Sequence, residues 1–115
     1  MSLANLRLDL HNKLVAALGS NNVYYQPPAD ISMSYPCVVY HFDDDMTLHA
    51  NNSPYWKYYT FTATLITKNP VPTEFMAAMD DMDYASFERH YTADNLHHFS
   101  YKNYLPYVRP SYHQL

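Results

Sequence analysis

The stretch YYTFTATLIT, residues 58–67, alternates apolar and hydroxylated side chains along most of its length. Every second residue from 59 to 65 is apolar, and the three residues between them are threonines. A period of two places these sets on opposite faces of a β-strand. The segment therefore predicts a strand with one face in the core and one face carrying hydroxyl groups.

A second strand is predicted just before it, at CVVYHF, residues 37–42. This run is apolar on both faces, which is typical of a central strand. Residues 43–54, DDDMTLHANNSP, connect the two strands. Hairpin connections usually need only about two to five residues, and longer ones are often functional. The sequence therefore predicts a projecting acidic loop over residues 43–54.

Two helices are predicted on either side of this pair of strands. Residues 3–18 carry leucines at spacings of three and four, with Ser2 as N-cap and Gly19 as the stop. A second helix is predicted over about residues 72–81, where Pro72 suits the first turn.

Three further strands complete the expected fold. They are residues 23–25, residues 84–91 with Ala85, Phe87, Arg89 and Tyr91 on one side, and residues 96–101. Together these elements predict an α+β fold, a mainly antiparallel sheet of about four to five strands flanked by two helices. The expected organisation is a single domain over residues 1–101, followed by an extended C-terminal tail over residues 102–115.

The composition is rich in tyrosine and poor in glycine. The 115 residues include 13 tyrosines and one glycine. Tyrosine joins an apolar ring to a polar tip, a combination enriched at protein interfaces. This indicates an assembly subunit, and a tyrosine-rich monomer is the alternative.

Charge and cysteine content exclude several classes of protein. The net charge is −4, and the seven lysines and arginines are scattered, which argues against nucleic-acid binding by phosphate neutralisation. The single cysteine rules out an internal disulfide and a cysteine-built zinc site. The sequence shows no signal peptide and no apolar span of about 20 residues, so we expect a soluble chain without a membrane role.

Metal and catalytic sites receive little support. Consecutive side chains of an extended segment point in opposite directions, so the aspartate run at 43–45 cannot converge on one cation without a tight turn. His97 and His98 face opposite ways on a strand for the same reason. A small metal-dependent hydrolase using His41, Asp43 and His49 is a less favoured alternative. A module that binds single-stranded nucleic acid by tyrosine stacking ranks last, because the sequence offers no positive groove. No nucleophile motif or phosphate-binding glycine loop is present, so we expect neither an enzyme nor a cofactor.

Four stretches carry a family resemblance: NVYYQPP (22–28), YPCVVY (35–40), YTFTATLITKNP (59–70) and SFERHYTADNLHH (86–98). They resemble the tail completion, or tail terminator, proteins of long-tailed siphophages, also called minor tail proteins. The YPC and TADNL pieces are the most specific. Residues after Tyr101 match nothing in the family, and Trp56 is unusual for it.

The resemblance implies a structural virion protein, a homohexameric ring that caps the phage tail tube and forms the head–tail joining surface. Its partners would be the major tail protein and a head-completion or connector protein, and DNA would pass through without specific binding. The location implied is the head-proximal end of the tail, and the host cytoplasm before assembly. Another head–tail connector or minor tail component of similar fold is the alternative.

Candidate contact residues follow from this interpretation. A ring subunit needs two different surfaces that meet around a closed rotation. Acidic side chains near a channel would also repel passing DNA. The predicted assembly or channel loop comprises Asp43, Asp44, Asp45, Thr47, His49, Asn51, Asn52, Tyr55 and Trp56. The predicted subunit interface comprises Tyr104, Tyr107 and Arg109.

Overall fold

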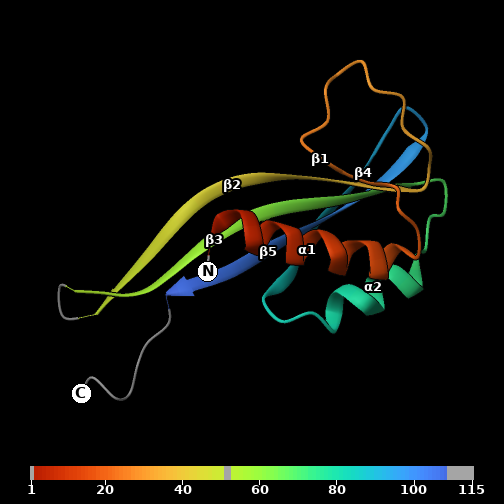
Figure 1. Cartoon of the computed structure of the whole chain (residues 1–115). Helices are drawn as coiled ribbons and strands as arrows, with labels where there is room; N and C mark the ends of the chain where they lie inside the picture. Colours follow the sequence, from red (N-terminus) through yellow and green to blue (C-terminus); the bar gives the residue numbers. More distant parts are fainter. Residues whose placement is uncertain (1, 51–52, 109–115) are drawn as a thin grey trace.

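The computed structural model describes residues 2–50 and 53–108, with the side chains of residues 50, 53–55 and 108 excepted. Within these ranges the chain forms two helices and one five-stranded mixed sheet (Figure 1). The elements, in chain order, are α1 (Leu3–Leu18), β1 (Val23–Tyr25), β2 (Cys37–Ala50), β3 (Ser53–Thr67), α2 (Thr73–Asp80), β4 (Ala85–Ala93) and β5 (Leu96–Val108). The predicted α+β class, with two flanking helices, is confirmed.

The sheet is built around three long strands. Its order is β1-β2-β3-β5-β4, and only the β1–β2 pair is parallel. The helices pack on one face of this sheet, called here the covered face, and the opposite face, called the open face, carries no helix among the described residues (Figure 1). The alternation in β3 sets these faces, because Phe61 and Leu65 are buried under the helices while Thr62 and Thr64 lie on the other side.

The first helix begins and ends at the expected residues. The Ser2 hydroxyl accepts a hydrogen bond from the Asn5 N–H at 3.1 Å, which satisfies one unpaired donor of the first turn. Gly19 ends the helix with a φ of 77°, and its N–H donates to the Val15 carbonyl at 2.9 Å. A left-handed φ costs glycine no Cβ clash, so the only glycine of the chain is used where the backbone needs one.

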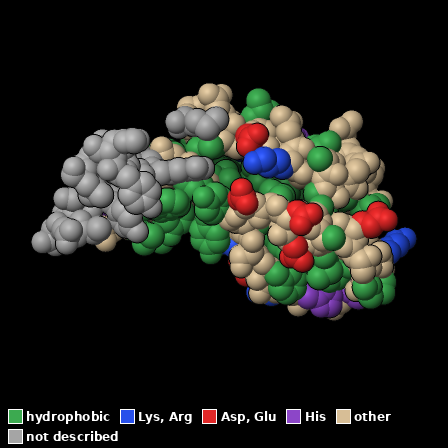
Figure 2. Space-filling model, turned by 90° about the horizontal axis from the view of Figure 1, so that it is seen from below, with side chains coloured by type: hydrophobic (Ala, Val, Ile, Leu, Met, Phe, Trp, Pro, Cys, Tyr) green, Lys and Arg blue, Asp and Glu red, His purple; other side chains and the backbone are tan. Residues whose placement is uncertain are grey.

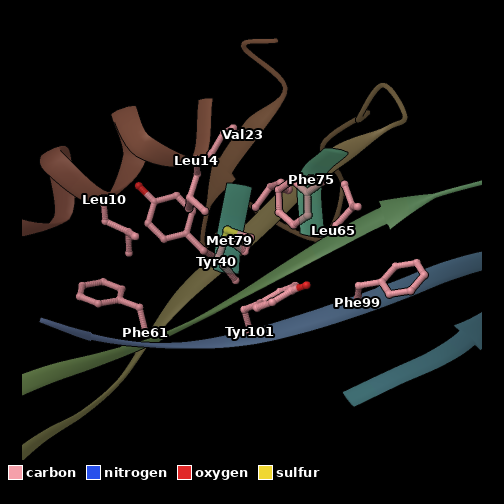
Figure 3. Close-up of a cluster of buried hydrophobic side chains, with 12 residues drawn as sticks. Leu10, Leu14, Val23, Tyr40, Phe61, Leu65, Phe75, Met79, Phe99 and Tyr101 are labelled. Atoms are coloured by element: carbon pink, nitrogen blue, oxygen red, sulfur yellow. The ribbon is translucent and has the colours of Figure 1, made fainter. Parts of the chain in front are cut away.

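The core lies between the helices and the covered face (Figure 3). Leucines of α1 and Phe75 and Met79 of α2 meet side chains from β1, β2, β3 and β5. The buried members are Leu10, Leu14, Val23, Val38, Tyr40, Phe61, Ala63, Leu65, Phe75, Met79, Phe99 and Tyr101. Aromatic rings fill much of this volume, which agrees with the tyrosine-rich composition.

One buried tyrosine is fixed by a polar cap from α1. Tyr40 is fully buried, and its hydroxyl accepts from Arg7 Nη1 at 2.9 Å and lies 2.7 Å from His11 Nδ1. Because the hydroxyl has one hydrogen to give, this hydrogen can donate to an unprotonated His11 Nδ1. Burial and the neighbouring Arg7 charge lower the pKa of His11, which favours that neutral form.

Three strands are longer in the structure than the sequence predicts. Residues 43–50 continue β2 and residues 53–57 belong to β3, paired from Asp44↔Thr60 to Ala50↔Ser53, so the expected twelve-residue loop is a β-hairpin. Residues 102–108 continue β5 and pair with β3 as far as Lys57↔Val108, so the chain stays in the sheet beyond the expected boundary at residue 101. Residues 109–115 lie outside the described residues.

The face assignment in β4 was also wrong. The register shifts between Phe87, which pairs with Tyr101, and Arg89, which pairs with Ser100. This bulge sends Phe87 to the covered face and turns Tyr91 to the open face, where it stacks on His98. Strict alternation had placed both aromatic side chains on one side.

Candidate assembly surface

The β2–β3 hairpin extends well past the end of the helices, on the left of Figure 1. We call this projection, with the strand beside it, the arm: residues 43–50 of β2, residues 53–59 of β3 and residues 104–108 of β5. It contributes to an elongated shape of 52 × 28 × 22 Å. Backbone pairing to a neighbouring strand holds it in place, so its side chains are presented on an ordered element.

The three aspartates at the base of the arm have three separate environments. A register shift between Phe42 and Asp44 inserts Asp43 as an extra residue in β2. The Asp43 carboxylate turns to the open face, the Asp44 carboxylate accepts from the Asp45 N–H at 2.8 Å, and Asp45 lies on the covered face. The run is therefore not a single acidic cluster.

Asp43 is the centre of a polar network on the open face. Its Oδ2 accepts from Lys102 Nζ at 3.0 Å and from the Thr62 hydroxyl, and its Oδ1 lies 3.0 Å from His41 Nε2. Burial alone would raise the pKa of Asp43. The hydrogen bonds from Thr62 and Lys102, with the charges of Lys102 and His41, outweigh burial and hold that pKa below its ordinary value of 3.8.

This network gives a testable pH dependence of stability. The Asp43 carboxylate contributes its stabilisation above its unfolded pKa, near 3.8, and loses it as the pH falls through the lower native pKa. We expect Asp43→Asn to reduce the free energy of unfolding by about 1–2 kcal/mol at neutral pH, through loss of charge-assisted hydrogen bonds.

Chemical denaturation at neutral pH and at successive values below about pH 4 would measure this effect. The deficit of the Asn variant should shrink in acid, because wild-type Asp43 becomes protonated there. Asp44→Asn is the matched control, since the exposed Asp44 side chain bonds only to the adjacent backbone N–H in the part of the chain described. An Asp43→Asn deficit that stays constant with pH, or an equal loss in both variants, contradicts the assignment.

Within the arm, aromatic contacts and a hydrogen bond join the β2–β3 hairpin to the end of β5. Tyr107 stacks on Tyr59 with ring centroids 4.2 Å apart, and its hydroxyl donates to Asp45 Oδ1 at 2.7 Å. This hydrogen bond, with the nearby Asp45 charge, raises the pKa of Tyr107 to about 12. On the open face, Tyr104 meets the edge of Tyr58 at 5.7 Å. These contacts bring Tyr104 and Tyr107 of the predicted subunit interface next to strands β2 and β3, which contain the described residues of the predicted loop.

The outer part of the arm exposes apolar side chains. Leu48 is 47% exposed and Met46 is 37% exposed, and both lie in β2. Leu48 pairs with Trp56 across the hairpin, and Trp56 in turn meets the ring of Tyr84 at 6.4 Å. Figure 2 shows hydrophobic side chains where the arm leaves the helical layer. Partly buried Phe42, Tyr59 and Leu105 extend the core in the same direction.

The remaining candidate residues divide into three groups. Thr47 and His49 lie in the outer part of β2 and pair with Lys57 and Pro54. Tyr55 lies in β3, but its side chain is outside the described part. Asn51, Asn52 and Arg109 lie outside the described residues.

The hydrolase combination does not converge. His41 contacts Asp43, but His49 lies six residues farther along the same strand, about 20 Å away at the rise of an extended chain. Among residues 2–50 and 53–108, no three His, Cys, Asp or Glu side chains are grouped to hold a metal ion. The geometry gives the hydrolase hypothesis no support.

Sequence reasoning missed several members of this surface. Lys102 falls in the predicted extended C-terminal tail, whereas in the structure it continues the alternation of β5. Thr62 was placed correctly on the hydroxylated face, but nothing in its local pattern pairs it with Asp43. Met46 and Leu48 fall in the predicted loop, so the sequence did not indicate that they are exposed apolar side chains of a strand.

No protein-family model matches the chain, and no curated protein matches it significantly. In the part of the chain that the structure describes, neither helix is long and apolar enough to cross a membrane.

Proposed function

We propose that this chain is a structural virion protein, a tail terminator or tail completion protein that assembles as a homohexameric ring on the end of a phage tail tube. The ring would cap the tube and form the surface that joins the tail to the head. Its partners in this proposal are the major tail protein and a head-completion or connector protein, and DNA passes through the ring. The proposal extends the sequence resemblance and requires no catalytic step.

The main support for this proposal is the projecting arm with its exposed apolar side chains. A ring subunit must offer one surface to one neighbour and a different surface to the other. A paired, projecting hairpin can reach beyond its own subunit, and apolar side chains on its outer part lose water when a partner covers them. In this proposal the body of the domain would supply the second surface.

The charges of the arm also suit a contact surface. Asp43 and Asp45 are each held by a partner from β5, so their charges are positioned by the fold. Asp44 is exposed and leaves one carboxylate free to repel DNA or to meet a basic group on a neighbour. Asp45 is exposed as well, although its carboxylate accepts from Tyr107, and the contact role of Asp43, Asp44 and Asp45 stays a proposal.

Mass measurement tests the proposal. Multi-angle light scattering of the purified chain, with and without tail tubes built from a phage major tail protein, should show the chain leaving the free fraction and joining the tubes. A monomer in isolation agrees with the proposal, since a ring can close on its template. A chain that stays monomeric and never associates with tubes contradicts it.

A further inference from the structure

The β4–β5 hairpin holds two histidines side by side at the end of the sheet farthest from the arm. Asp94 and Asn95 form its two-residue turn, with φ values of 53° and 61°, the left-handed pair that suits a tight hairpin. This turn fixes the register so that His90 is opposite Phe99 and His97 is opposite Thr92.

The two imidazole rings meet through their nitrogens. His90 Nε2 lies 3.0 Å from His97 Nδ1, and the ring planes differ by 20°. The His90 ring also lies 4.7 Å from the buried ring of Phe99, which supports the pair from the core side. His90 is exposed and His97 is half-buried, so a small ion can reach the pair from solvent.

From this geometry we propose that His90 and His97 form a surface site for a divalent transition-metal ion, with Cu²⁺ as the preferred ion. Imidazole nitrogen is a good ligand for copper, nickel and zinc, and copper binds most strongly in this series. Two imidazole nitrogens bonded to one metal at about 2.0–2.1 Å are about 2.9 Å apart at a right angle and about 4 Å apart in a straight line. The observed 3.0 Å, a hydrogen-bond distance in the metal-free pair, lies within that range.

His97 also lines an open hollow beside the pair. A cavity of about 470 Å³ is lined by Thr92, Ala93, Asp94, Asn95 and His97. It has room for water molecules as the further ligands of an ion held by the two histidines. The site uses two histidine ligands, consistent with the absence of any three-residue group of potential ligands in the described part of the chain. This inference is independent of the proposed tail function.

Copper titration tests the proposal. Cu²⁺ added to the full chain near neutral pH should bind with one saturable equivalent by calorimetry, and electron paramagnetic resonance should show two coordinated nitrogens. His90→Gln and His97→Gln should each weaken that equivalent at least about tenfold, because the second imidazole no longer binds intramolecularly. His98→Gln is the matched control: His98 is adjacent to His97 but stacks on Tyr91 on the open face.

Three results would overturn the site. They are the absence of saturable binding in the wild-type chain, equal affinity in all variants, and an equal loss in His98→Gln. Far-UV circular dichroism checks that each variant folds. If one does not, paramagnetic broadening of the His90 and His97 ring protons in the wild-type chain decides the question, and broadening confined to other histidines contradicts the proposal.

Discussion

Phe61→Ala is expected to lower the free energy of unfolding by about 3–5 kcal/mol. Phe61 is fully buried in β3, and its ring packs against Phe42 at 5.5 Å, Tyr40 at 6.2 Å and Tyr25 at 6.3 Å. Truncation removes the transfer free energy of the ring and leaves a cavity among aromatic neighbours that cannot collapse freely. Equilibrium urea denaturation, followed by circular dichroism, measures the change.

Phe87→Ala is the matched control for this variant. Phe87 has the same side chain and lies on the same face of the same sheet, but it is 47% exposed on the edge strand β4. We expect it to lose about 1 kcal/mol, since its ring keeps much of its contact with water when folded. Equal losses in the two variants would show that the core is not centred on β3.

Leu48→Asp should reduce binding to tail tubes at least about a hundredfold, which corresponds to about 2.7 kcal/mol. Leu48 is about half exposed on the outer arm, where the proposed partner would bury it. A carboxylate buried there without a partner costs far more than the lost methyl contacts. Co-sedimentation of the variant with tubes measures the affinity, and its unfolding free energy should stay within about 0.5 kcal/mol of the wild type.

Val71→Asp is the control for the arm. Val71 is 62% exposed in the β3–α2 connection, at the opposite end of the molecule from the arm (Figure 1). The same charge placed there should leave tube binding within about twofold of the wild type. Loss of tube binding in both variants, or in neither, would contradict the proposed role of the arm in assembly.

Local periodicity predicted the body of the fold well. The leucine stripe of α1, with Ser2 and Gly19 at its ends, predicted the observed helix, and the Thr alternation of β3 predicted which face is buried. Both signals come from short-range geometry, one of period 3.6 and one of period two, and tertiary packing does not alter them here.

Two β-bulges explain why the sequence predicted neither the arm nor the faces on which Phe87 and Tyr91 of β4 lie. The extra residue near Asp43 breaks the alternation of β2 where the strand leaves the core. Residues 43–50 that follow are mostly polar, so they were predicted as a loop. The shift between Phe87 and Arg89 reverses the faces of the residues that follow. A bulge depends on the partner strand, and a single strand does not reveal its partner.

The contacts of the candidate site were not predicted for the same reason: they depend on which strands pair and in which register. The sequence placed contact residues at 43–56 and at 104–109, but nothing in it indicated that Tyr107 would bond to Asp45 or that Lys102 would bond to Asp43. Those pairs are about sixty residues apart in the chain and meet only because β5 pairs with β3 along its whole length. Register, which sets such meetings, is fixed by the complete sheet.

Electron microscopy of the purified chain mixed with tail tubes would show whether the chain caps a tail tube as a ring. The proposed function predicts a six-subunit ring at one end of each tube, with the arm of every subunit in contact with a neighbour or with the tube. Tubes with bare ends under saturating protein, or density bound along their sides, would contradict it.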